Sequence, residues 1–479
     1  MVNQKNQKPQ LSEGESNSSK RRAEWQEKSH NAVTRKVLEQ DANFFINQAV
    51  SSPCLSVVKK AEGACIEDTN GRSYLDFHGN NVHHIGYGHP DLKKAISLQM
   101  DALPFAPRRF ACDSALELAK KLAEISPGNL SKVLFTAGGS DAIEVALKIA
   151  RAATGRHKTI SFWDSFHGAG FGAASVGGEQ LFRSHVSGPL LPGTEHVAPF
   201  ACYRCPYGYP DLNGKPQIEV CNSTCADFVR YVLEKEGDVA AVIAEPVRAV
   251  PYIPPPGYWK MVRQACNEYG ALLIFDEIPT GLGKTGKMFA CEHDDTVPDL
   301  LVLGKALGGG ILPIAAVLAR AELDVAGNYA LGHYTHEKNP VTAKAALTTI
   351  EIIEQQNLVE NAEVLGKYML DQLNSLKNKH ISIGDVRGLG LLIGVELVLN
   401  RKQKTAAEDL AEDVLYRCLG KGLSFKITMG NVLTLSPPLI ITKEQIDFSL
   451  LILDQCISEA VEAAAVSYTH LTLPTSDLV

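Results

Sequence analysis

The segment Ala271–Pro313 constrains the fold of this 479-residue chain more than any other stretch. It contains two short apolar runs, Ala271–Phe275 and Leu300–Leu303, whose length and boundaries predict two buried β-strands. The first run is followed by Asp276-Glu277 and the second by Gly304-Lys305. In parallel α/β sheets, ligands bind at the carboxyl ends of strands. We therefore expect a carboxylate and an amine at the same edge of one sheet.

Composition narrows the class of protein. Charged residues make up 21% and hydrophobic residues 45% of the chain, which is typical of a globular protein with a large α/β unit or several domains. The net charge of −7 and the lack of a basic stripe argue against a nucleic-acid partner. No apolar leader opens the chain and no run of 18 apolar residues occurs, so we expect no signal peptide and no membrane span. Eleven scattered cysteines favour reduced thiols and a cytoplasmic location.

The order of patterns predicts five segments. Residues 1–33 are polar and read as a poorly ordered tail. Residues 34–88 are expected to belong to the N-terminal part of a small domain, 89–340 to a large domain and 341–465 to a C-terminal α+β part of the small domain. Val466–Thr475, VSYTHLTLPT, can be encoded codon for codon by a transposase sequencing adapter. We therefore expect residues 466–479 to be a non-native tail.

A strand-turn-helix pattern upstream predicts an anion site. The short strand Lys132–Thr136 runs into Ala137-Gly138-Gly139-Ser140-Asp141, and apolar residues at helical spacing come next. Glycines at a helix start let backbone N–H groups approach an anion, and the helix dipole favours negative charge there. The alternative role of such a turn is only to cap the helix.

Lys305, Asp276 and this turn together indicate a site for pyridoxal phosphate. A lysine at a strand end can hold an aldehyde as a Schiff base, and a carboxylate facing a pyridine nitrogen keeps the nitrogen protonated. Alternatively, both residues are solvated ends of core strands. Phe166, after another strand-like segment, could stack on a planar ring or pack in the core. A further buried strand, Val239–Glu245, ends in Glu245 and leads to Arg248.

Two groups of residues raise the question of a metal. His83, His84 and His89 have no cysteine or carboxylate nearby in sequence to complete a ligand set, so packing or substrate contact is the preferred interpretation. Cys202-x2-Cys205 and Cys221-x3-Cys225 are separated by 15 residues, as in zinc ribbons. Partly buried reduced thiols are the alternative, and no metal is predicted.

The order of these parts resembles class-III aminotransferases, which are pyridoxal phosphate enzymes of fold type I, over about residues 34–465. The resemblance implies an α/β fold with a large, mostly parallel sheet and a small α+β domain. It also implies catalytic roles for Lys305 and Asp276, and a homodimer with shared active sites. The cofactor-binding residues that it implies are Gly139, Ser140, Phe166, His167, Glu245, Asp276, Lys305 and Thr335, the last reaching the cofactor of the neighbouring subunit.

Departures from the family pattern bear on the substrate. A glutamine that donates to the cofactor ring oxygen in many members is replaced by Pro279, which has no side-chain donor. An arginine that grips a carboxylate is replaced by Thr434. A transaminase that uses glutamate or alanine is therefore less expected, unless Arg387 or another arginine compensates.

The segment Asn80–Gly86 resembles ethanolamine-phosphate phospho-lyases, and the whole chain most resembles (R)-1-hydroxy-2-aminoethylphosphonate ammonia-lyases. Both substrates are short amines with an anionic phosphorus group and no carboxylate. The resemblance implies ammonia-lyase activity, and Arg109 and Arg248 are the candidates for binding the phosphonate, with surface ion pairs as the alternative. Transamination of an ω-amine such as 2-aminoethylphosphonate, phospho-lyase activity, and a non-enzymatic binding module are the other interpretations.

Overall fold

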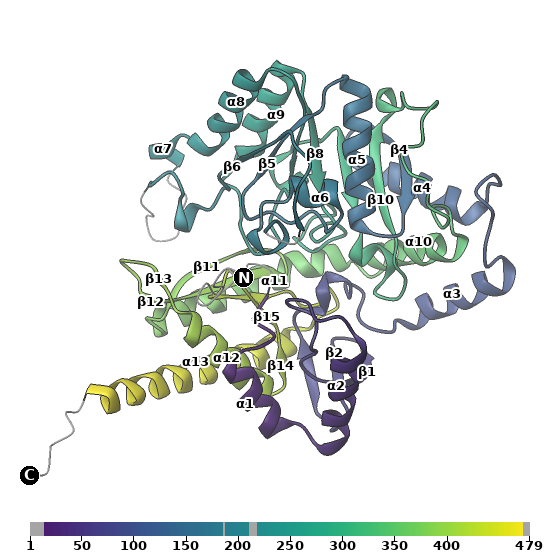
Figure 1. The fold of residues 1–479 in the computed structure, drawn as a ribbon. Coiled ribbons are helices and arrows are strands. Elements are labelled where there is room, and N and C mark those ends of the chain that lie inside the picture. The colour runs from purple at the N-terminus through teal and green to yellow at the C-terminus, as the bar shows by residue number, and fades with distance from the viewer. Residues whose placement is uncertain (1–13, 185–186, 210–217, 473–479) are drawn as a thin grey trace, which may run out of the picture.

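Three β-sheets and the helices around them form the computed structural model (Figure 1), which describes residues 14–184, 187–209 and 218–472. The largest sheet has seven strands in the order β4-β10-β9-β8-β7-β5-β6. Strands β9, β8, β7, β5 and β6 run parallel, whereas β10 is antiparallel to both of its neighbours. The α/β fold that the sequence predicts is therefore confirmed. The strands span Leu130–Thr136 (β4), Lys158–Phe162 (β5), Thr194–Val197 (β6), Val239–Ala244 (β7), Leu272–Asp276 (β8), Leu300–Leu303 (β9) and Ala315–Arg320 (β10).

Helices cover both faces of this sheet, which explains why its central strands read as unbroken apolar runs. Strands β7, β8 and β9 are buried along their whole length. Helices α5 and α6 pack on one face, and α4, α8, α9 and α10 pack on the other. The helices span Pro90–Ala102 (α3), Asp113–Ile125 (α4), Gly139–Thr154 (α5), Phe171–Val176 (α6), Ile218–Cys221 (α7), Thr224–Glu236 (α8), Tyr258–Tyr269 (α9) and Pro340–Gln355 (α10).

Two smaller sheets lie below the large one in the view of Figure 1. One has the order β1-β2-β3-β14, and its β2–β3 hairpin turns between Asp68 and Ser73. The other has the order β11-β12-β16-β15, with β13 paired to β12. Their strands span Val58–Glu62 (β1), Cys65–Asp68 (β2), Ser73–Asp76 (β3), Ile383–Leu389 (β11), Leu392–Asn400 (β12), Thr405–Ala406 (β13), Leu423–Ser424 (β14), Lys426–Thr428 (β15) and Val432–Leu435 (β16).

The sheet β1-β2-β3-β14 joins the N-terminal and C-terminal parts of the chain, because β14 pairs in parallel with β3. Helices α11 (Leu358–Lys379), α12 (Glu408–Gly420) and α13 (Lys443–Thr472) accompany them. Helix α10, which the sequence assigns to the small domain, packs against α3 and α4. The domain boundaries at 88/89 and 340/341 stay predictions.

The N-terminal segment differs from the expected disordered tail. Helices α1 (Lys20–Ser29) and α2 (Ala32–Phe44) lie within or begin in residues 20–33. Trp25 is only 8% exposed, and its ring centroid lies 6.0 Å from that of Tyr416 on α12. Arg22 of the same helix is also buried and donates to the Pro53 carbonyl at 2.7 Å, so α1 is attached to the rest of the chain by more than one residue. Residues 1–13 and 473–479 of the predicted tails lie outside the described residues.

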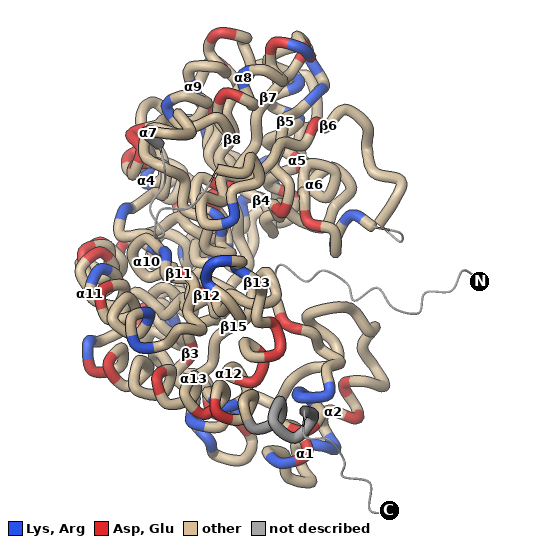
Figure 2. The backbone as a smooth tube through the Cα atoms, turned by 90° about the vertical axis from the view of Figure 1, so that its left-hand side faces the viewer, with Lys and Arg blue, Asp and Glu red and all other residues tan. Residues whose placement is uncertain are grey.

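Charge is spread over the whole molecule. Figure 2 shows Lys and Arg interspersed with Asp and Glu in both the upper and the lower part of the chain. Within the described part of the chain, no helix has both the length and the apolar composition needed to cross a membrane.

Candidate active site

The predicted carboxylate and amine lie at one edge of the seven-stranded sheet. Strands β8 and β9 are parallel neighbours, with Asp276 paired to Val302. Asp276 is the last residue of β8, and Lys305 begins the short turn after β9. Asp276 is buried, whereas Lys305 is exposed and has a left-handed φ of 44°. Such a backbone conformation is strained for a non-glycine residue and is often found at functional sites.

A pocket of about 190 Å³ contains seven of the predicted site residues. They come from the ends of β7, β8 and β9, from the start of α5 and from the loop after β5. The pocket is lined by Gly139, Ser140, Phe166, His167, Gly168, Glu245, Ala249, Asp276, Ile278, Pro279 and Lys305. Sequence patterns contain no signal for Ala249 or Ile278, because both are apolar residues in loops.

His167 fixes the orientation of Asp276. Its Nδ1 lies 2.8 Å from Oδ2 of Asp276, and the backbone N–H of Ile278 donates to Oδ1 at 3.1 Å. An ionised carboxylate only accepts hydrogen bonds, so Nδ1 of His167 carries the proton. The neighbouring Glu277 points elsewhere, accepting from the N–H groups of Ala290 and Cys291, and burial raises its pKa to about 7.

The start of α5 forms a closely packed cradle. The first-turn N–H groups of an α-helix lack partners within the helix, so those of Gly139 and Ser140 can bind an anion. The loop after β5 approaches this turn, with the N–H of Ala169 donating to Oγ of Ser140 at 3.1 Å. A Cβ on Gly168, whose φ is 130°, would lie 2.3 Å from the same Oγ. Only glycine therefore fits at position 168.

Glu245 lies at the side of the pocket and organises its surroundings. It is 4% exposed and accepts from the N–H groups of Phe166 at 3.5 Å and Ala249 at 3.1 Å. Arg248 donates to the same carboxylate at 3.4 Å and lies over the ring of Tyr252, 5.4 Å from its centroid. Arg248 is thus close to the pocket without lining it.

Two predicted site residues lie apart from the pocket. Thr335 and Arg109 are both exposed, and neither lines the pocket. Their loops touch each other, since Arg108 lies 2.7 Å from Nδ1 of His333, and the rings of Phe105 and His336 are 5.4 Å apart.

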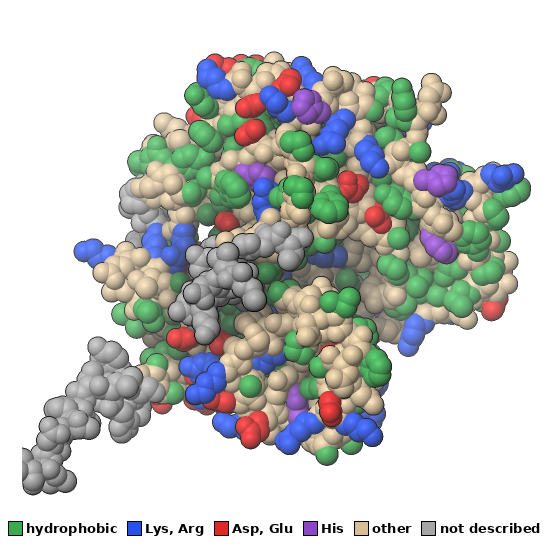
Figure 3. All heavy atoms as spheres, viewed as in Figure 1, with side chains coloured by type: hydrophobic (Ala, Val, Ile, Leu, Met, Phe, Trp, Pro, Cys, Tyr) green, Lys and Arg blue, Asp and Glu red, His purple; other side chains and the backbone are tan. Residues whose placement is uncertain are grey.

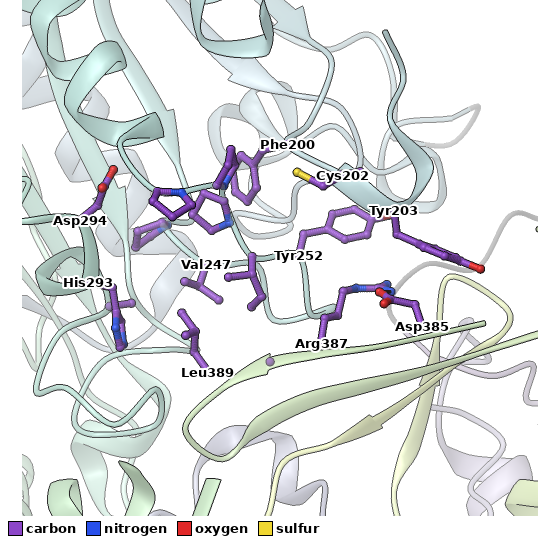
Figure 4. A pocket seen from close by; sticks show the side chains of 18 of the residues that line it. Phe200, Cys202, Tyr203, Val247, Tyr252, His293, Asp294, Asp385, Arg387 and Leu389 are labelled. Atoms are coloured by element: carbon purple, nitrogen blue, oxygen red, sulfur yellow. Dashed lines mark hydrogen bonds and ion pairs between the residues drawn. The ribbon is translucent and has the colours of Figure 1, made fainter. Parts of the chain in front are cut away.

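A larger cavity of about 420 Å³ separates the loop after β7 from the small sheet (Figure 4). Arg387 of β11 lines it and is held by Asp385 at 2.9 Å and by Glu396 at 2.7 Å. Its guanidinium group also lies 5.5 Å from the ring centroid of Tyr252. Arg387, considered above as a substitute for the missing arginine, is therefore committed to these two carboxylates.

The two groups of residues considered above as metal ligands, the histidines and the cysteine pairs, have different surroundings. Nε2 of His83 lies 3.1 Å from the carbonyl of Asp76, and Nε2 of His84 lies 3.3 Å from that of Gly281, as in packed core histidines. The thiols of Cys202, Cys205, Cys221 and Cys225 line one small cavity. Burial, and then the other three thiols, raise the pKa of Cys225 to about 12. In the described ranges, no three His, Cys, Asp or Glu side chains are grouped so as to hold a metal.

Comparison with known proteins gives a consistent result. The family "Aminotransferase class-III" matches residues 46–457. The (R)-1-hydroxy-2-aminoethylphosphonate ammonia-lyase of Vibrio splendidus is 44% identical over 94% of this chain and 95% of its own length. The leucine/methionine racemase of Thermococcus litoralis is 38% identical over 89% of this chain and 96% of its own length.

Solved structures agree in fold. The omega transaminase of Pseudomonas jessenii in complex with PMP has a TM-score of 0.83 and 28% identity, covering 89% of this chain and 98% of that chain. A Bacillus anthracis aminotransferase has a TM-score of 0.80 and 30% identity, covering 89% of this chain and 98% of that chain. The family is dependent on pyridoxal phosphate, and the buried carboxylate, the helix start and the accessible lysine of the pocket fit that cofactor. This chain belongs to the class-III aminotransferase family.

Proposed function

We propose that this chain is a pyridoxal phosphate-dependent ammonia-lyase that converts (R)-1-hydroxy-2-aminoethylphosphonate to phosphonoacetaldehyde and ammonia. The observation that carries the proposal is the replacement of the carboxylate-binding arginine by Thr434. Its Oγ1 lies 2.7 Å from Oγ1 of Thr428 in a buried pair. A neutral threonine pair cannot form the bidentate clamp that a substrate carboxylate needs. Similarity to the Vibrio enzyme supports a substrate without a carboxylate.

Lys305 and Asp276 have the catalytic roles in this proposal. When bound, pyridoxal phosphate supplies a carbon that links to the substrate amine and a ring that accepts electrons. Lys305 would act as the general base that removes the proton from the substrate carbon bearing the nitrogen. Asp276 holds the ring nitrogen protonated, and His167 keeps the carboxylate in place.

The remaining pocket residues position the cofactor. The N–H groups of Gly139 and Ser140 would hold its phosphate and Phe166 would lie against its ring, while Glu245 fixes the loops on either side. The substrate hydroxyl leaves with a proton as water, and water returns when the resulting imine is hydrolysed to the aldehyde and ammonia. The reaction is therefore balanced without a second substrate.

Transamination of an ω-amine such as 2-aminoethylphosphonate is the second candidate. The observation that favours it is the likeness to the Pseudomonas jessenii omega transaminase. A transaminase would need a keto acid as its second substrate, whereas the lyase needs no acceptor. Phospho-lyase activity on ethanolamine phosphate would release inorganic phosphate instead.

The test is ammonia release from (R)-1-hydroxy-2-aminoethylphosphonate by the cofactor-loaded protein without a keto acid. Many equivalents of ammonia per site are expected. A single equivalent of product that leaves the cofactor in the amine form would establish transamination. Release of phosphate from ethanolamine phosphate under the same conditions would establish the phospho-lyase.

We also propose that the enzyme is a homodimer with shared active sites, in which Thr335 reaches the cofactor of the neighbouring subunit. Exposed apolar side chains support this proposal, and Figure 3 shows them gathered on the right, over α3 and the loops beside it. Those on α3 and the loop that follows it are Leu98, Met100, Leu103, Phe105 and Phe110. Contiguous exposed apolar surface of this kind marks interaction sites. Light scattering during gel filtration should give twice the chain mass.

A further inference from the structure

The ring of Phe166, which lines the pocket, rests against a second phenylalanine ring. The ring centroid of Phe182 lies 4.5 Å from that of Phe166, with an angle of 49° between the ring planes. Aromatic side chains that pack favourably have centroid separations of about this size. Phe182 ends the short turn Gln180–Phe182 and does not itself line the pocket. It therefore stands behind the part of the pocket wall that Phe166 forms.

Residues 177–183, which we call the brace segment, begin with an attachment to the chain just before Phe166. The N–H of Gly178 donates to the carbonyl of Ser165 at 2.8 Å. The approach is so close that a Cβ on Gly178 would lie 2.1 Å from the carbonyl oxygen of Phe162. Only glycine therefore fits at position 178, and the start of the brace segment is fixed relative to Phe166.

Arg183 attaches the other end of the brace segment to helix α6. Its Nη1 donates to the carbonyl oxygens of Ala174 at 3.3 Å and Ser175 at 2.9 Å, and also to that of Gly177. These carbonyls lie at the C-terminal end of α6, where backbone acceptors lack partners within the helix. Phe182, the neighbour of Arg183 in the chain, is therefore held between two fixed points.

Helix α6 is in turn attached to α5, whose start forms the cradle described above. The N–H of Ala173 donates to Oε1 of Glu144 at 2.9 Å, and a Cβ on Gly172 would lie 2.2 Å from Oε2 of the same carboxylate. Glu144 lies in the second turn of α5, soon after the cradle residue Ser140. The brace segment therefore links the ring of Phe166 to the helix that begins at the cradle.

The contact with Phe182 restrains a side chain that the protein core leaves unsupported. In the described part of the chain, neither Phe166 nor Phe182 belongs to or packs against a hydrophobic core cluster. A phenylalanine side chain rotates about two bonds and adopts several orientations unless its neighbours select one. An orientation that is selected before a ligand binds lowers the ordering cost of binding. The brace segment thus supplies what the core does not, a fixed neighbour for the ring of Phe166.

We propose that Phe182 is a positioning residue that holds the ring of Phe166 in the orientation in which it lies against the cofactor ring. The inference rests on the proposed function, since it requires pyridoxal phosphate in the pocket with Phe166 beside it. Phe182 touches neither the cofactor nor the substrate and acts through Phe166. The alternative is that Phe182 only fills space, in which case the effect of its loss is independent of Phe166.

The test measures pyridoxal phosphate affinity by equilibrium dialysis and the visible circular dichroism of the bound cofactor, so that turnover is not needed. The variants are Phe182→Ala, Phe166→Ala, the double variant that combines them, and Phe182→Tyr, which keeps an aromatic ring. Phe171→Ala is the matched control, because Phe171 lies in the same region, at the start of α6, but is 64% exposed.

Phe182→Ala should weaken pyridoxal phosphate binding by about 3- to 10-fold, the range expected for one aromatic pair, and should lower the visible circular dichroism. Phe182→Tyr should bind the cofactor within about twofold of the wild type, because the ring contact is kept, and Phe171→Ala should match the wild type. If Phe182→Ala does not fold, Phe182→Leu replaces it and carries the same expectation.

The double variant separates positioning from space filling. Because Phe182 acts through Phe166, its loss should matter little once Phe166 is absent. The double variant should therefore bind pyridoxal phosphate within about twofold of Phe166→Ala alone, whereas two independent effects would multiply.

Equal cofactor affinity and visible circular dichroism in the wild type and Phe182→Ala would overturn the role of Phe182 and leave the proposed function standing. Losses in the two single variants that multiply in the double variant would do the same. If the wild type does not bind pyridoxal phosphate, the pocket is not a cofactor site, and both proposals are rejected.

Discussion

The edge of the seven-stranded sheet that carries the candidate site and the face of the small sheet that carries Thr434 are built in different ways. At the edge, each functional group ends a strand or begins a helix, as Asp276 and Ser140 do. On the face, Lys426 and Thr434 meet only through strand pairing. The first arrangement depends on local chain order and the second on register. We therefore expect the edge to determine whether chemistry occurs, and the face to determine on which amine.

The substitution Lys305→Ala tests the catalytic role of the sheet edge and should have the largest effect. We expect ammonia release to fall by a factor on the order of 10³–10⁴, because the general base is lost. The far-UV circular dichroism spectrum should be retained, since Lys305 is exposed. Residual activity within tenfold of the wild type would contradict the assignment of Lys305 as the base.

Asp276→Asn should have the next largest effect, lowering turnover by a factor on the order of 10² while leaving the KM within a few-fold. An amide cannot hold the ring nitrogen protonated. His167→Asn should give a smaller loss in the same direction, because His167 orients the Asp276 carboxylate without being that carboxylate. The cofactor absorbance of both variants is measured as a function of pH. An absorbance that still changes with pH shows that the variant is folded and binds the cofactor. An unchanged turnover in Asp276→Asn would remove the electron-sink role from that carboxylate.

A pair of glycine variants sharpens the comparison at the helix start. Gly168→Ala should weaken pyridoxal phosphate binding by about tenfold or more, because its Cβ would meet Oγ of Ser140 and its φ is 130°. Gly138→Ala should bind the cofactor as the wild type does, since its φ is −154° and its Cβ would meet nothing within 4 Å. Cofactor affinity is measured by equilibrium dialysis. Equal effects of the two substitutions would show that the close packing at Gly168 does not shape the cradle.

The smallest effect concerns the junction between the edge and the face, where Nζ of Lys284 donates to the Pro437 carbonyl at 2.7 Å. Burial lowers the pKa of Lys284 from 10.5 to about 7. Between these values the unfolded chain binds the proton and the folded chain does not, so this residue makes stability rise with pH from about 7 to 10.5.

In Lys284→Met, the rise in the free energy of unfolding over that range should be smaller by at most about 1.4 kcal/mol per pH unit, the limit for one proton. Urea denaturation at several pH values measures it. Parallel pH profiles for the two proteins would show that Lys284 keeps its proton when folded.

Much of the candidate site at the edge of the seven-stranded sheet could be predicted, because parallel strands place their carboxyl ends at the same edge of a sheet. Two apolar runs followed by Asp276 and Lys305 placed these two residues at one edge of the sheet, while the fold type and the other pocket residues were implied by the family resemblance. The ordered α1 was missed because its polar composition conceals long-range contacts, made by the buried residues Arg22 and Trp25. Local periodicity gives no information on a contact made 391 residues away, at Tyr416.

The sequence by itself determined the α/β fold, the strand-end position of Asp276 and Lys305, and the loss of an arginine at Thr434. Tertiary structure alone decided that His167 orients Asp276, that Arg387 is held by two carboxylates and that Lys426 stands opposite Thr434. Chain order determines which side chain stands at the end of a strand, because a side chain cannot move away from its own backbone. Cross-strand neighbours depend on register, which is set by the packing of the whole sheet.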